Sequence, residues 1–124
     1  MKKYTIHENE VKAVSLPGRK HKMIIGPDNF GKSKTMCFGV ADFPANQHAP
    51  THVHQVQEEI LYVLTGKGEM YFDSKIEKIE IGTCIFVPPK VEHSIKNTSN
   101  EVLKVAYVFS PPAKQGSYDK NNLL

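Results

Sequence analysis

The chain has 124 residues, of which 40% are hydrophobic and 23% are charged, and its net charge is +3 with neutral histidines. This length fits one domain with a single core, and the composition is ordinary for a soluble protein. No basic stripe typical of nucleic-acid binding, no membrane-length apolar run and no secretory signal is found. We therefore expect a cytoplasmic protein without nucleic-acid or membrane partners.

Short runs of β-type residues follow one another along the chain, separated by glycine, proline and asparagine turn signals. No window shows the 3.6-residue period of an amphipathic helix. Regularly spaced short strands favour a β-sandwich or barrel. The expected strands cover approximately residues 13–16, 22–25, 35–43, 51–56, 60–64, 68–72, 78–81, 84–87, 93–97 and 102–109.

Residues 26–33, GPDNFGKS, match the pattern of a phosphate-binding loop letter for letter. Such a loop works only when a helix follows it and directs its N-terminus at the phosphates. The residues after Ser33, KTMCFGVADF, favour a strand instead. We therefore interpret residues 26–33 as an exposed turn between two strands and not as a nucleotide site.

The stretch THVHQVQEEILYVLTG, residues 51–66, contains two histidines separated by one residue. Side chains two apart in a strand point to the same face, so the imidazoles of His52 and His54 can converge on one point. A carboxylate follows at Glu59 or at Glu58. The pattern therefore offers two neutral nitrogen donors and one carboxylate oxygen from neighbouring segments.

A second stretch, GTCIFVPPKVEHSIKN, residues 82–97, supplies a third imidazole. A glycine turn leads into an apolar strand, the two prolines end it, and the following strand begins at His93. Alternation places Asn97 on the same face as His93, and we expect Asn97 to form hydrogen bonds rather than bind a metal. Three imidazoles and one carboxylate form a ligand set for a divalent transition metal.

The two stretches resemble the two motifs of the cupin superfamily. In the first motif, the six-residue interval to Gly66 selects Glu59, which leaves Glu58 as an outward-facing carboxylate. Lys90 stands where the second motif has a glycine, which puts the turn geometry in question because lysine resists positive φ. The usual glycine before His52 is also missing. The matching positions are His52, His54, Glu59 and Gly66 in the first motif, and Gly82, Pro88, His93 and Asn97 in the second.

The resemblance implies an all-β fold, the double-stranded β-helix or jelly-roll barrel, formed by residues 34–112. Residues 1–33 would add N-terminal strands to the same domain, packed on its own sheet or on a partner subunit, and residues 113–124 would form a polar tail. It also implies a homodimer. One divalent ion per chain, Fe, Mn, Ni, Co or Zn, would be bound by His52, His54, Glu59 and His93.

Cupins perform several reactions, so the resemblance implies a function only in outline. We expect a small metal-dependent enzyme, of the oxygenase, decarboxylase, isomerase or lyase type, that acts on a small oxygenated metabolite. The alternative is a non-catalytic module that binds or senses a metal or a small molecule. The sequence identifies no catalytic residue beyond the metal ligands.

Other residues receive more general expectations. We expect Cys37 and Cys84 to be buried free thiols, and the basic residues at 19–22 to be solvated surface. His7, His21 and His48 are expected in loops, the last of them near the barrel mouth with Gln47. The aromatic and methionine residues expected in the core or the pocket wall are Tyr62, Met70, Phe72, Phe86 and Tyr107.

Overall fold

The computed structural model describes residues 3–114, and its regular secondary structure consists almost entirely of β-strands. Most of the predicted polar tail, residues 115–124, lies outside the described residues. The helical structure among the described residues is limited to one 3-10 turn at Glu8–Glu10, and none of it is long and apolar enough to cross a membrane. The strands are β1 Val14–Leu16, β2 Arg19–Ile25, β3 Cys37–Phe43, β4 Glu58–Thr65, β5 Lys67–Phe72, β6 Lys75–Glu80, β7 Cys84–Val87, β8 His93–Asn97 and β9 Leu103–Ser110.

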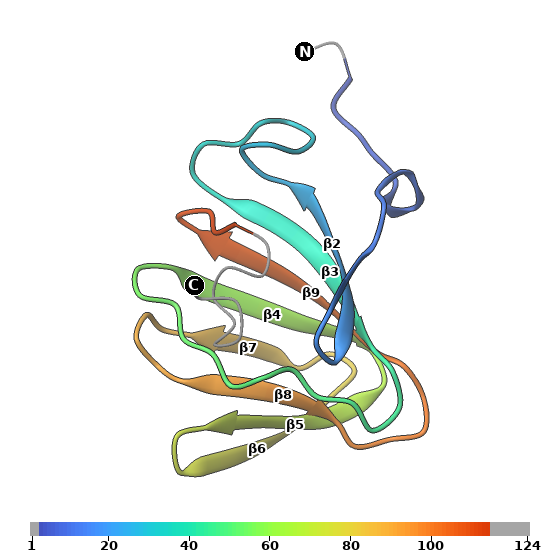
Figure 1. Ribbon diagram of the computed structural model, residues 1–124, viewed down its shortest axis with the longest axis vertical. Helices are drawn as coiled ribbons and strands as arrows, with labels where there is room; N and C mark the ends of the chain where they lie inside the picture. Colours follow the sequence, from blue (N-terminus) through green and yellow to red (C-terminus); the bar gives the residue numbers. More distant parts are fainter. Residues whose placement is uncertain (1–2, 115–124) are drawn as a thin grey trace.

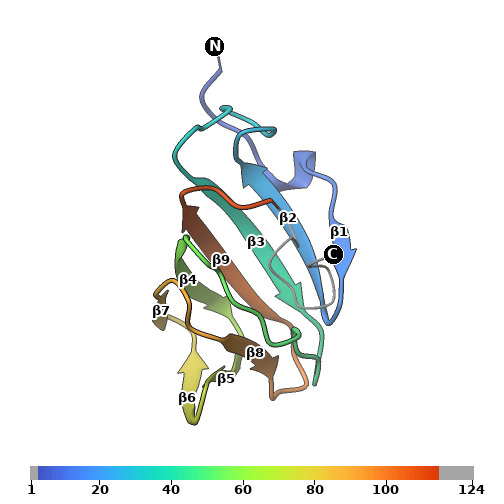
Figure 2. The ribbon, with the colours of Figure 1, turned by 60° about the vertical axis from the view of Figure 1, so that its left-hand side comes forward.

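The strands form two sheets that face each other. The larger has the order β1-β2-β3-β9-β4-β7 and the smaller the order β6-β5-β8. Every pair of neighbouring strands is antiparallel. Figure 1 shows the larger sheet as a twisted fan, and Figure 2 shows β5, β6 and β8 set against its lower part. This arrangement confirms the predicted all-β jelly-roll fold.

The core lies between the two sheets. β9 shows why the sequence folds this way, because its side chains alternate between buried and half-buried. The inward set is Leu103, Val105, Tyr107 and Phe109, each at most 2% exposed. Full burial of such a side chain contributes about 1.5–3 kcal/mol, so this strand alone supplies much of the apolar contact between the sheets.

The expected strand at residues 51–56 is absent, and this prediction was wrong. Residues 44–57 instead form an irregular segment with isolated bridges from His48 to Lys96 and from His52 to His93. Pro50 lacks an N–H group and cannot donate to a sheet ladder, which prevents continuous pairing. In Figure 1 this green segment passes beside β8 before it enters β4.

Residues 26–33 connect β2 to β3, and the two strands are antiparallel neighbours. The connection is largely exposed and closes with turn hydrogen bonds, such as the one from the Lys32 N–H to the Asn29 carbonyl at 3.1 Å. Gly31 and Lys32 both have positive φ, 80° and 46°. No helix starts in this part of the described chain, so the predicted turn between strands is confirmed.

Three expected core residues lie on the outside. Tyr62 is 46% exposed and Phe86 is 55% exposed, and Cys84 is also exposed. All three point away from the smaller sheet because β4 and β7 alternate, with Leu61 and Ile85 directed inward. The other expectations hold: Cys37 is a buried free thiol, Met70 and Tyr107 are buried, and Phe72 packs against the core.

Candidate metal centre

The four candidate ligands meet between the two sheets. His52, His54, Glu59 and His93 are between 1% and 6% exposed, and each offers a donor atom within 4.8 Å of every other. They come from three places: the irregular segment before β4, the start of β4, and the start of β8. This buried group could hold a metal ion, as the two sequence motifs suggest.

Backbone hydrogen bonds fix the irregular segment against β8. His52 and His93 exchange two N–H···O bonds of 2.9 Å, and the N–H of Ala49 donates to the carbonyl of Ile95 at 3.0 Å. Two imidazoles from distant parts of the sequence are thereby held opposite each other, with ring centroids 4.2 Å apart. The segment positions its histidines without belonging to a strand.

The turn before β8 is tied to the same segment. Lys90 has φ of 70°, the left-handed conformation that a glycine would adopt at this motif position. A non-glycine residue pays about 1–2 kcal/mol for this conformation. The N–H of Lys90 donates to the carbonyl of His54 at 2.7 Å. Lys90 therefore adopts the turn conformation expected of the motif glycine. The turn is also hydrogen-bonded to the segment that carries the first motif.

Two of the imidazoles have fixed tautomers. Nδ1 of His52 lies 2.8 Å from the Pro50 carbonyl oxygen, and Nδ1 of His93 lies 2.9 Å from the Val91 carbonyl oxygen. A carbonyl only accepts, so Nδ1 carries the proton in both rings. This is the outer contact that usually orients a metal-binding histidine. Nε2 of His93 is buried without a hydrogen-bond partner, as a metal ligand would be.

Glu59 lies at the centre of the group. Its Oε1 is 3.1 Å from Nε2 of His54 and 3.3 Å from Nε2 of His93. Ligands about 2.0–2.2 Å from an ion lie roughly 3 Å apart when they subtend a right angle at it. The two contacts therefore match neighbouring positions around one ion, and the residues fit the metal that the motifs imply.

The electrostatics of the group favour metal binding at neutral pH. Burial, with the nearby His93, lowers the pKa of His52 to about 3, so this imidazole stays neutral. Burial alone would raise the pKa of Glu59, but the imidazoles of His54 and His93 outweigh it and lower the pKa to about 2. A neutral imidazole and an ionised carboxylate are the forms that bind metals.

Strand alternation places only one of the two glutamates beside the histidines. β4 begins at Glu58, which is exposed, and its next residue, Glu59, points into the barrel. Asn97 is fully buried and forms hydrogen bonds, as expected, with the carbonyls of Phe43, Pro44 and Glu101. His7 caps the 3-10 turn and lies away from the site.

A cavity of about 30 Å³ adjoins the ligand group, and two of its wall residues were missed in the sequence. Arg19 and His21, expected as surface and loop residues, are 5% and 3% exposed and face inward from β2. The expected strand began at residue 22, three residues too late. The alternation of Arg19, His21 and Met23 in RKHKMII was the signal that could have placed them.

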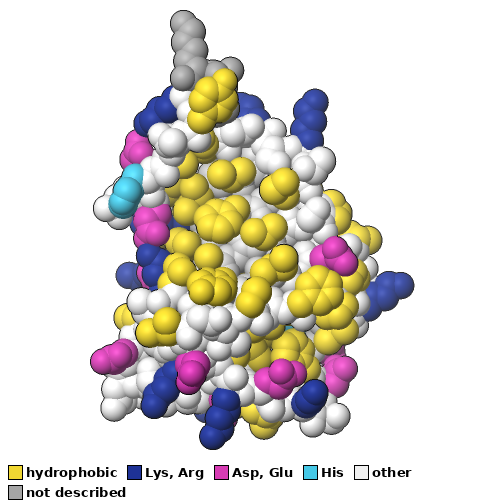
Figure 3. Space-filling model, turned by 180° about the vertical axis from the view of Figure 1, so that it is seen from behind, with side chains coloured by type: hydrophobic (Ala, Val, Ile, Leu, Met, Phe, Trp, Pro, Cys, Tyr) yellow, Lys and Arg dark blue, Asp and Glu magenta, His cyan; other side chains and the backbone are white. Residues whose placement is uncertain are grey.

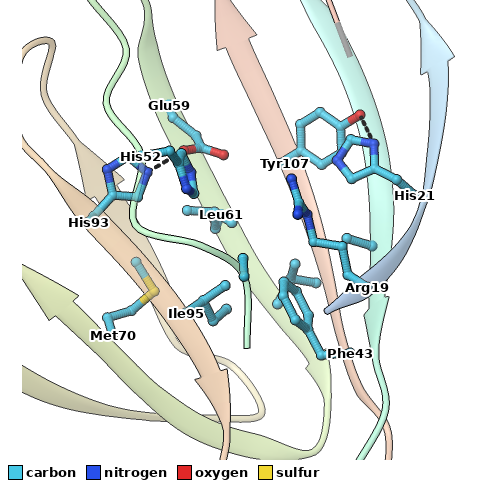
Figure 4. Close-up of a pocket in the computed structure, with 13 residues that line it drawn as sticks. Arg19, His21, Phe43, His52, Glu59, Leu61, Met70, His93, Ile95 and Tyr107 are labelled. Atoms are coloured by element: carbon cyan, nitrogen blue, oxygen red, sulfur yellow. Dashed lines mark hydrogen bonds and ion pairs between the residues drawn. The ribbon is translucent and has the colours of Figure 1, made fainter. Parts of the chain in front are cut away.

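The opposite sides of this cavity differ in character. Figure 4 shows His52, Glu59 and His93 on one side and Arg19, His21 and Tyr107 on the other. Tyr107 stacks on His21 with ring centroids 4.7 Å apart, and its hydroxyl is 3.3 Å from Nδ1 of His21. The floor between the two sides is apolar and includes Phe43, Leu61, Met70 and Ile95.

Comparisons with known proteins agree with this architecture. The profile of a family described as the cupin domain matches residues 39–109. An uncharacterized protein of Methanocaldococcus jannaschii is 33% identical over 84 residues, which cover 68% of this chain and 67% of the relative. An oxalate-binding protein of Thermotoga maritima is 31% identical over 77 residues, which cover 62% of this chain and 64% of the relative.

Solved structures share the fold at low sequence identity. A predicted oxalate decarboxylase from Thermotoga maritima superposes with a TM-score of 0.78 at 21% identity, over 87% of this chain and 99% of the other. KdgF from Halomonas sp. superposes with a TM-score of 0.76 at 16% identity, over 92% and 97% of the two chains. Identities this low establish a common fold and leave the reaction open.

Proposed function

The chain belongs to the cupin family, and on this premise we propose that His52, His54, Glu59 and His93 bind one divalent transition-metal ion. The observation that carries the proposal is the buried Nε2 of His93, which has no hydrogen-bond partner and faces an ionised carboxylate. Imidazole and carboxylate together suit Fe, Mn, Co, Ni or Zn, and the donor types do not select one of them.

We further propose that the protein is a metal-dependent enzyme for a small oxygenated metabolite. When bound, the metal would supply Lewis-acid or oxygen-activating chemistry to a ligand in the cavity. The residues of this chain would hold that ligand and exclude water, because the cavity floor is apolar. The paired Tyr107 hydroxyl and His21 imidazole, 3.3 Å apart, give the cavity groups that can hold or transfer a proton.

A second candidate function is non-catalytic binding. Two relatives carry binding rather than catalytic names: the oxalate-binding protein of Thermotoga maritima and auxin-binding protein 1 of Arabidopsis thaliana, which is 29% identical over 113 residues. These residues cover 56% of the second relative. A small cavity beside a metal centre would also serve a receptor or a carrier.

Turnover by the metal-loaded protein separates the two functions. We expect one member of a panel of small hydroxy acids, keto acids and sugar acids to be converted to a product detectable by NMR. The metal-free protein, prepared with a chelator, is the control and should leave the panel unchanged. A compound that binds the metal-loaded protein but is recovered intact would favour the binding module and contradict the enzyme.

The proposed function includes a homodimer that forms through the outer face of the larger sheet. β1 and β2 already pair with β3 of the same chain, so we assign the dimer contact to this face rather than to exchanged strands. Figure 3 shows apolar side chains gathered over it, with charged side chains toward its margins. We define the outer face by Phe38, Ile60, Tyr62, Leu64, Phe86, Ala106 and Val108.

The size of this face suits a dimer. Ile60 lies directly opposite both Phe86 and Val108 on its neighbouring strands, so the apolar residues form a continuous row. The six strands of the larger sheet contain 37 residues, and a rise of about 3.3 Å per residue with a strand spacing of about 4.8 Å gives a face of roughly 600 Å². A standard interface buries about 800 Å² on each partner, and a twofold axis would bring two identical apolar faces together.

We expect light scattering at micromolar concentration to give twice the 13.9 kDa mass of one chain. Phe86→Lys should shift the protein to the monomer, because a charge would be buried within the contact. Ile76→Lys is the matched control, since Ile76 is 58% exposed on the other sheet, against 55% for Phe86. A monomeric wild type, or a dimer unaffected by Phe86→Lys, would refute this assignment.

A further inference from the structure

The cavity beside the metal ligands contains a buried cation. Arg19 is the first residue of β2, is 5% exposed, and lines the same cavity as His52, Glu59 and His93. One of its terminal nitrogens donates to the carbonyl of Pro17 at 2.8 Å, which helps to hold the guanidinium in place. A guanidinium carries a positive charge and offers five N–H donors in a planar fork.

The side chains of the cavity wall that carries Arg19 are closely packed. His21 and Tyr107 stack with an interplanar angle of 29°, and Gly39 on β3 gives the tyrosine its space. A Cβ atom at position 39 would lie 2.3 Å from the Tyr107 hydroxyl oxygen. This wall therefore presents a cation, an imidazole and a hydroxyl in a fixed arrangement to the side of the cavity that holds the metal ligands (Figure 4).

We propose that Arg19 makes the cavity selective for small carboxylates, with the carboxylate group of the ligand on Arg19 and its other oxygen directed to the metal side. The inference rests on the proposed function, because it assumes a metal at the four ligands. Guanidinium and carboxylate match each other in shape and charge. Charge–charge attraction is also stronger in a cavity shielded from water than at the surface.

The dimensions and the floor of the cavity restrict the ligand further. One water molecule needs roughly 10–15 Å³ of such space, so about 30 Å³ accommodates only a compact molecule. The apolar floor offers no hydrogen bonds to the additional hydroxyl groups of a sugar, and a buried hydroxyl without a partner is unfavourable. A two- or three-carbon hydroxy or keto acid satisfies both restrictions.

Glycolate and glycolamide provide the test, because they share size and shape and differ in charge. Both are titrated calorimetrically into protein whose bound metal has been measured by mass spectrometry. We expect the Arg19→Gln variant to keep its metal and to bind glycolate about tenfold to a hundredfold more weakly than wild type. Its affinity for glycolamide should change little. Lys20→Gln, which removes an exposed charge next in sequence, is the matched control.

The Arg19→Gln variant is needed because a bound metal ion would by itself favour the glycolate anion over neutral glycolamide. A glycolate affinity that Arg19→Gln leaves unchanged overturns the assignment, and so does metal-loaded wild-type protein that fails to bind glycolate. Arg19→Lys should recover part of the lost affinity, since lysine keeps the charge without the planar fork. Failure of the wild type to take up metal is a separate result that refutes the proposed function and removes the basis of this inference.

Discussion

Replacing His54 by alanine is expected to weaken binding of a divalent metal by about a hundredfold or more. Loss of an outer contact to a metal ligand typically costs 10–100-fold, and a ligand itself should cost at least as much. His54 is 1% exposed and its Nε2 lies 3.1 Å from the Glu59 carboxylate, at the centre of the buried group. Glu58→Ala should leave metal affinity nearly unchanged, because Glu58 is exposed on the opposite face of β4.

Competition with a chromophoric chelator measures the affinities, and a second measurement protects the result against misfolding. At 100 times its dissociation constant, a bound ion stabilises the folded state by about 2.7 kcal/mol. Zinc should therefore raise the melting temperature of wild type and of Glu58→Ala, but not that of His54→Ala. Circular dichroism in chelator should show the same β-structure in all three proteins. A larger loss in Glu58→Ala would contradict the choice of carboxylate.

The candidate ligands could be predicted because they depend on local spacing. Two histidines one residue apart face the same side of any extended segment, and this holds for His52 and His54 although they lie outside a strand. Alternation along β4 separates Glu59 from Glu58 in the same way. The same alternation, counted from Glu59, places Tyr62 on the outside. The alternation therefore predicts an exposed Tyr62, and the expectation of a buried Tyr62 was inconsistent with it.

The remaining features depend on neighbours that are distant in sequence. The segment that carries His52 is held by β8, some forty residues away in sequence. Nothing in the residues around His52 predicts this pairing. From the sequence alone, Arg19 is expected to be a surface charge. Its burial follows from the position of β2, which faces the cavity. Lys90 adopts a positive φ although lysine prefers a negative one, because this conformation lets its N–H donate to the His54 carbonyl. Tertiary contacts decide each of these features.

The Asn97 side chain connects the smaller sheet to the larger one at a place where no strand ladder joins them. Its amide nitrogen is 2.9 Å from the Phe43 carbonyl oxygen and 2.6 Å from that of Glu101. Its Oδ1 accepts from both the backbone N–H and the hydroxyl of Ser99, each at 2.9 Å. The end of β8 is thereby bound to the end of β3 and to the turn before β9. The segment carrying His52 and His54 starts directly after β3, so Asn97 also secures its origin.

We expect Asn97→Ala to lower the free energy of unfolding by about 3–5 kcal/mol. The substitution removes the donor from the buried Phe43 carbonyl and from the part-buried Glu101 carbonyl, at about 1–3 kcal/mol each, and it removes a side chain that is fully buried. Losses of this size are exceptional for one residue and take a large part of the 5–15 kcal/mol typical of a domain. Urea denaturation in the presence of chelator measures the loss without a contribution from bound metal.

Asn100→Ala is the matched control, because Asn100 lies exposed in the same turn. Its unfolding midpoint should stay close to that of wild type. Asn97→Asp should not restore stability, because a carboxylate keeps the acceptor for Ser99 but cannot donate to the carbonyl oxygens of Phe43 and Glu101. If Asn97→Ala lost less than about 1 kcal/mol, the three segments would have to be held by their backbone bonds alone. The amide would then satisfy its neighbours without fixing the start of the metal-binding segment.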